Sequence, residues 1–153
     1  MIVTIYKKIA VGGTFDKFHR GHEVLIKTAF DMGEEVLIGI TSDSFAGNKN
    51  HDIEPCSVRI SKLREFVNRF NKPYEIKEIF DVFGTADKDP DLDAIVVSEE
   101  TEKSADIINQ ERRKNNLNPL DVIVISWVLA EDSRPISSTR IRKKEIDWSG
   151  KLL

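Results

Sequence analysis

The sequence predicts a single α/β domain over residues 1–153, built on a doubly wound, five-stranded parallel sheet. Short runs that are almost wholly apolar alternate along the chain with segments whose apolar residues recur at helical spacing. Such runs suit strands covered on both faces, and their alternation with helices indicates right-handed βαβ crossovers. A chain of 153 residues has the length of one domain, and it contains no repeat, low-complexity tract or linker.

Each expected strand is a short apolar run between turn signals. The five runs cover residues 2–11, 35–41, 74–80, 94–98 and 122–127. In a parallel sheet the carboxyl ends of all strands meet at one edge, where ligands bind in folds of this kind. We therefore expect a Rossmann-like fold whose site gathers the polar residues that follow these strands.

Helices are expected between the strands. The first covers about residues 21–32, with Gly33 as a suitable C′ residue, and the next carries Ile60, Leu63, Val67 and Phe70 before Pro73. A polar helix follows over about 101–116. The long polar segments between these elements are read as loops.

A glycine turn joins the first strand to the first helix. Gly12 and Gly13 permit a sharp turn, and the following helix start directs its N–H groups toward the sheet edge, which predicts an anion site. His19 and His22 are three residues apart at that helix start. Cationic or proton-donating groups oppose the helix dipole there, unless a bound phosphate supplies the negative charge.

A second helix start, after residues 130–136, has the same character. Ser137 or Ser138 can cap it, while Arg140 and Arg142 put positive charge in its first turn. A capped surface helix explains this segment equally well when it is taken alone.

Composition narrows the class of partner. The net charge of −3 gives no general attraction to nucleic acid or membrane, although residues 134–144 hold five bases and no acid. This local basic patch fits a small anionic ligand. The single cysteine, Cys56, excludes an internal disulfide, and no signal peptide or membrane-spanning run is present, so we expect a cytoplasmic protein. An oligomer is compatible with these features.

Two motifs carry a resemblance to a known superfamily. Residues 13–22, Gly-Thr-Phe-Asp-Lys-Phe-His-Arg-Gly-His, resemble its HxGH signature, and residues 136–142, Ile-Ser-Ser-Thr-Arg-Ile-Arg, resemble its ISSTxxR signature. Members of this nucleotidyltransferase superfamily transfer a nucleoside monophosphate from an NTP and release pyrophosphate. Segments at 41–46, 98–101, 108–112 and 119–146 resemble the archaeal-type phosphopantetheine adenylyltransferases. The bacterial branch has Arg-Gly-Leu-Arg after the fourth strand, where this chain has residues 98–101, Ser-Glu-Glu-Thr.

The resemblance implies an ATP-binding transferase of coenzyme A biosynthesis, which converts ATP and 4′-phosphopantetheine into dephospho-coenzyme A and pyrophosphate. Mg²⁺ is expected with ATP, and no organic prosthetic group is expected. A phosphate is already a nucleophile, so the site needs donors and positive charge rather than a general base.

The motif match also implies roles for residues. His22 is expected to donate to the α-phosphate, and His19 to contact the ATP phosphates. Lys49 is expected to bind the acceptor phosphate, in competition with Lys7, Lys8 and Lys17, and Asp16 either orients the turn or helps to hold Mg²⁺. The remaining residues expected to bind the nucleotide are Gly13, Thr14, Phe15, Ser98, Ser137, Ser138, Thr139 and Arg140, of which Thr14 is also expected to take part in catalysis.

Three alternatives stay open at this point. The histidine pair could belong to a metal site, although only His51 and Cys56 would be left as similar ligands. The acceptor could instead be nicotinamide mononucleotide, FMN or glycerol phosphate, since both motifs are shared by adenylyl- and cytidylyltransferases with those acceptors. The chain could also be a catalytically silent ATP-binding domain.

Overall fold

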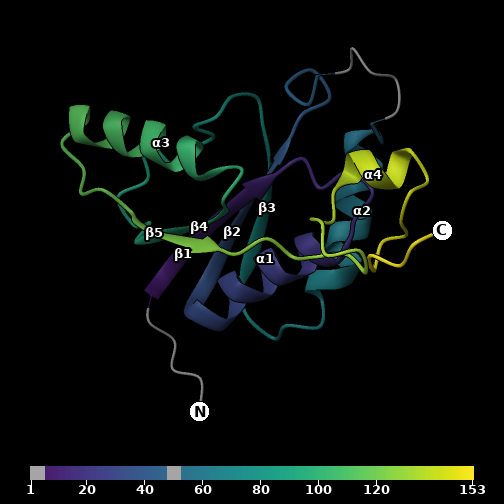
Figure 1. Ribbon diagram of the computed structural model, residues 1–153. Coiled ribbons are helices and arrows are strands. Elements are labelled where there is room, and N and C mark those ends of the chain that lie inside the picture. Colours follow the sequence, from purple (N-terminus) through teal and green to yellow (C-terminus); the bar gives the residue numbers. More distant parts are fainter. Residues whose placement is uncertain (1–5, 48–52) are drawn as a thin grey trace.

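The computed structural model describes residues 6–47 and 53–153, and it forms a five-stranded parallel sheet in the order β3-β2-β1-β4-β5 (Figure 1). Each neighbouring pair is parallel, as the apolar runs predict. The strands are β1 (Tyr6–Gly13), β2 (Gly33–Thr41), β3 (Tyr74–Ile79), β4 (Ala94–Ser98) and β5 (Asp121–Ile125). The order reverses direction at β1, so the turn after β1 lies where this fold binds ligands.

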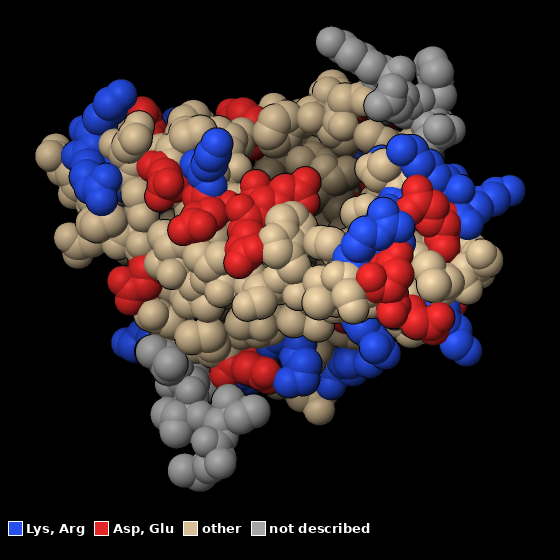
Figure 2. All heavy atoms as spheres, viewed as in Figure 1, with Lys and Arg blue, Asp and Glu red and all other residues tan. Residues whose placement is uncertain are grey.

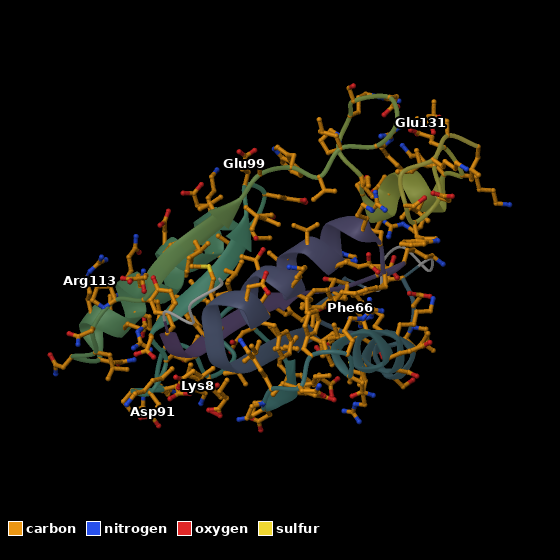
Figure 3. The ribbon with its side chains drawn as sticks, turned by 90° about the horizontal axis from the view of Figure 1, so that it is seen from below. Lys8, Phe66, Asp91, Glu99, Arg113 and Glu131 are labelled. Atoms are coloured by element: carbon orange, nitrogen blue, oxygen red, sulfur yellow. The ribbon has the colours of Figure 1, made fainter. Side chains whose placement is uncertain are left out.

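Helices cover both faces of the sheet, which confirms the doubly wound architecture. α1 (Arg20–Met32) and α2 (Cys56–Val67) pack on one face, and Phe66 lies between them (Figure 3). α3 (Glu102–Lys114) packs on the opposite face, over a smaller core of β1, β2 and β4 side chains. Within the described ranges, no helix has the length and apolar character needed to cross a bilayer.

Gly33 does not act as the left-handed C′ residue that the sequence suggests. It has φ −113° and begins β2 immediately after α1. A Cβ at this position would collide with Cγ2 of Ile9 on β1. The glycine is therefore required for close packing of β2 against β1 and not for backbone conformation.

Two other boundaries are shorter than expected. α2 ends at Val67, and Phe70 lies beyond it with its ring stacked 4.5 Å from that of Phe30. β5 ends at Ile125, so Trp127 follows the strand and its side chain is not packed inside it.

The C-terminal segment returns to the start of α1. The backbone N–H of Arg20 donates to the Trp148 carbonyl at 2.9 Å, and a small cluster of Ala130, Ile136 and Ile146 anchors the segment. This segment carries the short helix α4 (Ser138–Arg142). The chain thus brings its second motif beside the first, although they are more than a hundred residues apart in sequence.

Candidate active site

A pocket of about 350 Å³ opens beyond the carboxyl ends of β1, β4 and β5, between the turn after β1 and the start of α4. Figure 2 shows this face hollowed, with acidic side chains along one rim and a mixed group of basic and acidic side chains along the other. The expected residues that line the pocket are Gly13, Thr14, Phe15, Asp16, His19, His22, Ser98, Ser137, Ser138 and Thr139. The structure therefore brings both motifs together at the predicted edge of the sheet.

His19 and His22 form a reciprocal cap at the start of α1. Nδ1 of His19 accepts from the backbone N–H of Gly21 at 3.0 Å and of His22 at 3.4 Å, while Nδ1 of His22 accepts from the His19 N–H at 3.2 Å. The two rings stack with centroids 3.6 Å apart. Because both Nδ1 atoms accept, each neutral ring carries its proton on Nε2 and retains one donor.

The histidines are neutral and not cationic. Burial lowers the pKa of His19 to about 4, against a smaller opposing effect of the Asp16 carboxylate. Burial and the neighbouring His19 lower the pKa of His22 well below its ordinary value. Two cationic histidines would oppose the helix dipole, but neutral ones do not. Their Nδ1 atoms accept backbone N–H groups at the helix start, and their Nε2–H groups remain as donors.

Acid is expected to destabilise the protein through this pair. The folded-state pKa of His19 lies below its unfolded value of about 6.5, so the unfolded chain binds the proton more readily and stability is lost as the pH falls from about 6.5 to 4. This shift corresponds to roughly 3 kcal/mol in the free energy of unfolding. Urea unfolding over this pH range measures it.

The control is His19→Asn, whose side-chain oxygen can accept the same backbone N–H groups but does not titrate. We expect this variant to lose distinctly less stability over the same range. An equally steep pH dependence in the variant would assign the effect to other groups.

The turn between β1 and α1 is held in an uncommon conformation. Phe15 has φ +54° although it is not glycine, and its buried ring lies against Gly13, where an added Cβ would sit 3.4 Å from Cζ. Lys17 is also left-handed, with φ +50°. Two such residues in one short turn store strain of the kind found at binding sites, and the surrounding contacts must compensate for it.

Asp16 joins the two motifs. Its Oδ2 accepts from Nη1 of Arg142 at 2.5 Å, and its carbonyl oxygen accepts from the Ser138 hydroxyl at 2.6 Å. Its Oδ1 accepts from the backbone N–H of Glu54 at 2.8 Å. The side chain is 3% exposed. Asp16 therefore orients the turn, as one of its two expected roles requires.

The α4 hydroxyls differ in what they can still donate. Ser137 Oγ accepts from the Arg140 N–H, and Thr139 Oγ1 accepts from Nη2 of Arg142, so both keep a free proton. The Ser138 proton is already committed to the Asp16 carbonyl. Ser137 and Thr139 are the better donors to an anion in the pocket.

Arg140, unlike Arg142, is not brought to the pocket. Its guanidinium is bound by Asp132, at 3.2 Å from Nη1 and 2.5 Å from Nη2, and by Glu145 at 3.0 Å from Nε. Arg142 lines the pocket instead. The spacing of ISSTxxR itself puts the final arginine at position 142, so the sequence contained this signal.

Of the other expected site residues, Ser98 lies at the pocket and Lys49 is not among the described residues. Ser98 ends β4 at the pocket, and its backbone N–H donates to Thr101 Oγ1 at 3.1 Å. Lys49, expected to bind the acceptor phosphate, lies outside the described residues. Trp127 also lines the pocket and is 41% exposed.

Arg59 is the residue that the sequence reasoning missed. It is fully buried, and it donates to the carbonyl oxygens of Thr14, Thr41 and Glu54 at 2.7–2.9 Å. It lies one helical turn before Leu63, on the apolar face of α2. A charged residue on a face that is otherwise buried was the available signal.

Comparisons with known proteins agree with this geometry. The cytidylyltransferase-like family matches residues 10–144. The phosphopantetheine adenylyltransferase of Methanothermobacter thermautotrophicus is 49% identical over 148 residues, 97% of this chain and 90% of the relative. That of Methanopyrus kandleri is 43% identical over 140 residues, 90% of this chain and 89% of the relative.

A solved structure shares the fold. The crystal structure of a protein with unknown function from Archaeoglobus fulgidus has a TM-score of 0.70 and 32% identity, over 77% of this chain and 88% of that one. Together with two motifs that meet in one pocket, these findings establish that the chain belongs to the archaeal phosphopantetheine adenylyltransferases of the cytidylyltransferase-like family.

Proposed function

We propose that the chain transfers AMP from ATP to 4′-phosphopantetheine, giving dephospho-coenzyme A and pyrophosphate. The names of its relatives support this activity. The observation that carries it is the pocket in which Asp16 links the first motif to the second, so that two histidine donors and the α4 hydroxyls line one cavity.

In the proposed reaction, a phosphate oxygen of the acceptor attacks the α-phosphorus of ATP and forms a new P–O bond. The bond to the β-phosphate oxygen breaks, and pyrophosphate leaves with that electron pair. Nε2–H of His22 donates to the α-phosphate, whose charge grows in the transition state. His19 and Thr14 add further donors, while Ser137, Thr139 and Arg142 hold the leaving phosphates.

The neutral state of both histidines suits this role. A donor that is already protonated on Nε2 throughout the neutral range needs no titration step, and the enzyme requires no general base because the acceptor phosphate is the nucleophile. Turnover is thus independent of a histidine titration near pH 6.5 in this mechanism.

Mg²⁺ is proposed to arrive with the triphosphate. Among residues 6–47 and 53–153 there is no cluster of three carboxylate, histidine or cysteine side chains that could hold a metal. Both Asp16 oxygens are already bound, to Arg142 and to the Glu54 N–H, so Asp16 does not fit as a direct ligand in this arrangement. Mg²⁺ commonly keeps several waters and binds through substrate phosphates, which such a pocket accommodates.

A screen of pyrophosphate release tests the proposal. ATP and CTP are each offered with phosphopantetheine, nicotinamide mononucleotide, FMN and glycerol phosphate, with and without Mg²⁺. We expect release with ATP and phosphopantetheine, dependent on Mg²⁺. Faster release with another acceptor would reassign the substrate, and ATP binding without release would indicate a silent domain. A cytoplasmic location stays a prediction.

Arg142 is expected to matter for nucleotide binding. Arg142 lines the pocket and is paired with Asp16, so Arg142→Gln removes both a charge beside the proposed phosphate site and the ion pair that joins the two motifs. KM for ATP should rise by about tenfold or more. Steady-state kinetics at saturating phosphopantetheine measure this effect.

Arg140→Gln is the matched control, since it removes the same charge two residues earlier from a side chain bound to Asp132 and Glu145. Its KM for ATP should change less than about twofold, because its guanidinium serves the fold of this segment. If Arg140→Gln raises KM and Arg142→Gln does not, the assignment from the structure is reversed.

A further inference from the structure

Thr41 lies directly behind Thr14, outside the pocket. It is the last residue of β2 and is 9% exposed, whereas Thr14 lines the pocket. The two hydroxyl oxygens are 3.0 Å apart. Nη1 of the fully buried Arg59 has two N–H groups. One donates to the Thr14 carbonyl at 2.9 Å, and the other is shared between the Thr41 carbonyl at 2.8 Å and Thr41 Oγ1 at 3.3 Å.

The direction of these bonds follows from the number of protons. Arg59 can only donate, so Thr41 Oγ1 is an acceptor in that contact. If Thr14 also donated to Thr41 Oγ1, the single Thr41 proton would be buried without an acceptor. Buried polar groups in folded proteins are nearly always hydrogen-bonded. The satisfied arrangement therefore has Thr41 donating to Thr14 Oγ1.

This direction decides what Thr14 can do. Its oxygen is occupied as an acceptor toward the protein interior, so its own proton is left to point away from Thr41. Thr14 lines the pocket, where an oxygen of the substrate phosphate would accept this proton. A hydroxyl that is free to rotate would present sometimes a lone pair and sometimes a proton to that oxygen, and would therefore be a poorer donor than an oriented one.

We propose that Thr41 is a positioning residue. Together with Arg59 it forms a chain of hydrogen bonds with a fixed direction, here called the relay, which orients the Thr14 hydroxyl as a hydrogen-bond donor to the reacting phosphate. The relay runs from the guanidinium through the Thr41 hydroxyl to Thr14. The inference rests on the proposed function for the identity of the phosphate. The relay itself depends only on the buried contacts.

Arg59 also secures the backbone on both sides of the relay. The same Nη1 donates to the Thr14 carbonyl at 2.9 Å, so one guanidinium nitrogen fixes the main chain of Thr14 and of Thr41. Removal of the Thr41 hydroxyl alone leaves both of these bonds in place. The position of the turn and the orientation of the hydroxyl can thus be separated by mutation.

The test uses Thr41→Val, which keeps the shape of the side chain and removes only the hydroxyl, and Thr41→Ser, which keeps the hydroxyl. We expect kcat for pyrophosphate release to fall by about three- to tenfold in Thr41→Val, the scale of one oriented hydrogen bond, and to stay within about twofold in Thr41→Ser. KM for phosphopantetheine should change little in either. Wild-type kcat in Thr41→Val, or equal loss in both variants, would overturn the relay.

A double-mutant cycle with Thr14→Val separates the relay from a general structural effect. If Thr41 acts through Thr14, then adding Thr41→Val to Thr14→Val changes kcat by less than about twofold. The same factor in both backgrounds would overturn the proposal. Thr14→Ala replaces Thr14→Val in the cycle if the valine variant does not fold.

The outcome also separates this inference from the proposed function. If the wild-type chain binds ATP but releases no pyrophosphate, the proposed function fails, and the same four proteins are compared by their Kd for ATP. Coupling between positions 14 and 41 in that Kd supports the relay as a device for phosphate binding. Additive changes in Kd overturn it independently of the reaction.

Discussion

Replacement of His22 by asparagine is expected to lower kcat by about 10²–10³ while the start of α1 remains intact. The Asn side-chain oxygen occupies nearly the place of Nδ1 and can accept the His19 N–H, as His22 does at 3.2 Å. His22 lines the pocket, and the variant lacks its Nε2–H donor. Single-turnover kinetics with ATP and phosphopantetheine, with urea unfolding alongside, measure the two properties separately.

His22→Gln is the converse substitution. Its amide nitrogen reaches nearly the place of Nε2 and restores a donor, but no acceptor remains near the His19 N–H. We expect kcat to recover to within about tenfold of the wild type, and stability to fall by about 1 kcal/mol from loss of the cap contact. His22→Asn should thus keep stability and lose activity, whereas His22→Gln should lose stability and keep most of the activity.

This opposition is what distinguishes a catalytic donor from a capping residue. If His22 served only the helix, Asn would be nearly wild-type in kcat and Gln would be the damaged variant. If both variants lost activity in proportion to their stability, neither role could be assigned to Nε2. Near-normal turnover in His22→Asn would remove His22 from the proposed mechanism.

Local features of the site were predictable because they depend on neighbours in sequence. The glycine turn after β1, the helix start at His19 and the position of the motif at the sheet edge all follow from spacing and strand order. The neutral state and the tautomer of the histidines were not predictable, since the first depends on burial and the second on which ring nitrogen meets a backbone N–H. Only the folded cap shows that both Nδ1 atoms accept.

Long-range contacts explain the other differences. Gly33 is a glycine because of Ile9 on a neighbouring strand, and Arg140 leaves the pocket because Asp132 and Glu145 bind its guanidinium. No pattern in the sequence joins these pairs. The role of Arg59 also depends on such long-range contacts, because its partners come from the turn after β1, the end of β2 and the loop before α2.

Arg59→Met is expected to lower the free energy of unfolding by roughly 3–5 kcal/mol. The Asp43 partner is half exposed and can be solvated, so the loss arises mainly from the three carbonyl oxygens that lose their Arg59 donor. Since two of these belong to Thr14 and Thr41, the turn after β1 should also lose its fixed position. Urea unfolding and kcat measured at a temperature where the variant is folded provide the two readouts.

Arg112→Met is a matched control within the same chain. Arg112 is 1% exposed and also donates to three carbonyl oxygens, those of Ala86, Asp89 and Asn118, at 2.6–2.9 Å. Its neighbour Arg113 lies at the opposite end of the molecule from Glu131 and the α4 segment (Figure 3). Both variants should lose similar stability, but only Arg59→Met should lose kcat, by about tenfold or more, because one of its carbonyl partners, Thr14, lines the pocket. Equal effects on kcat would mean that the site responds to stability alone, and Arg59 would then be no more than a buried structural arginine.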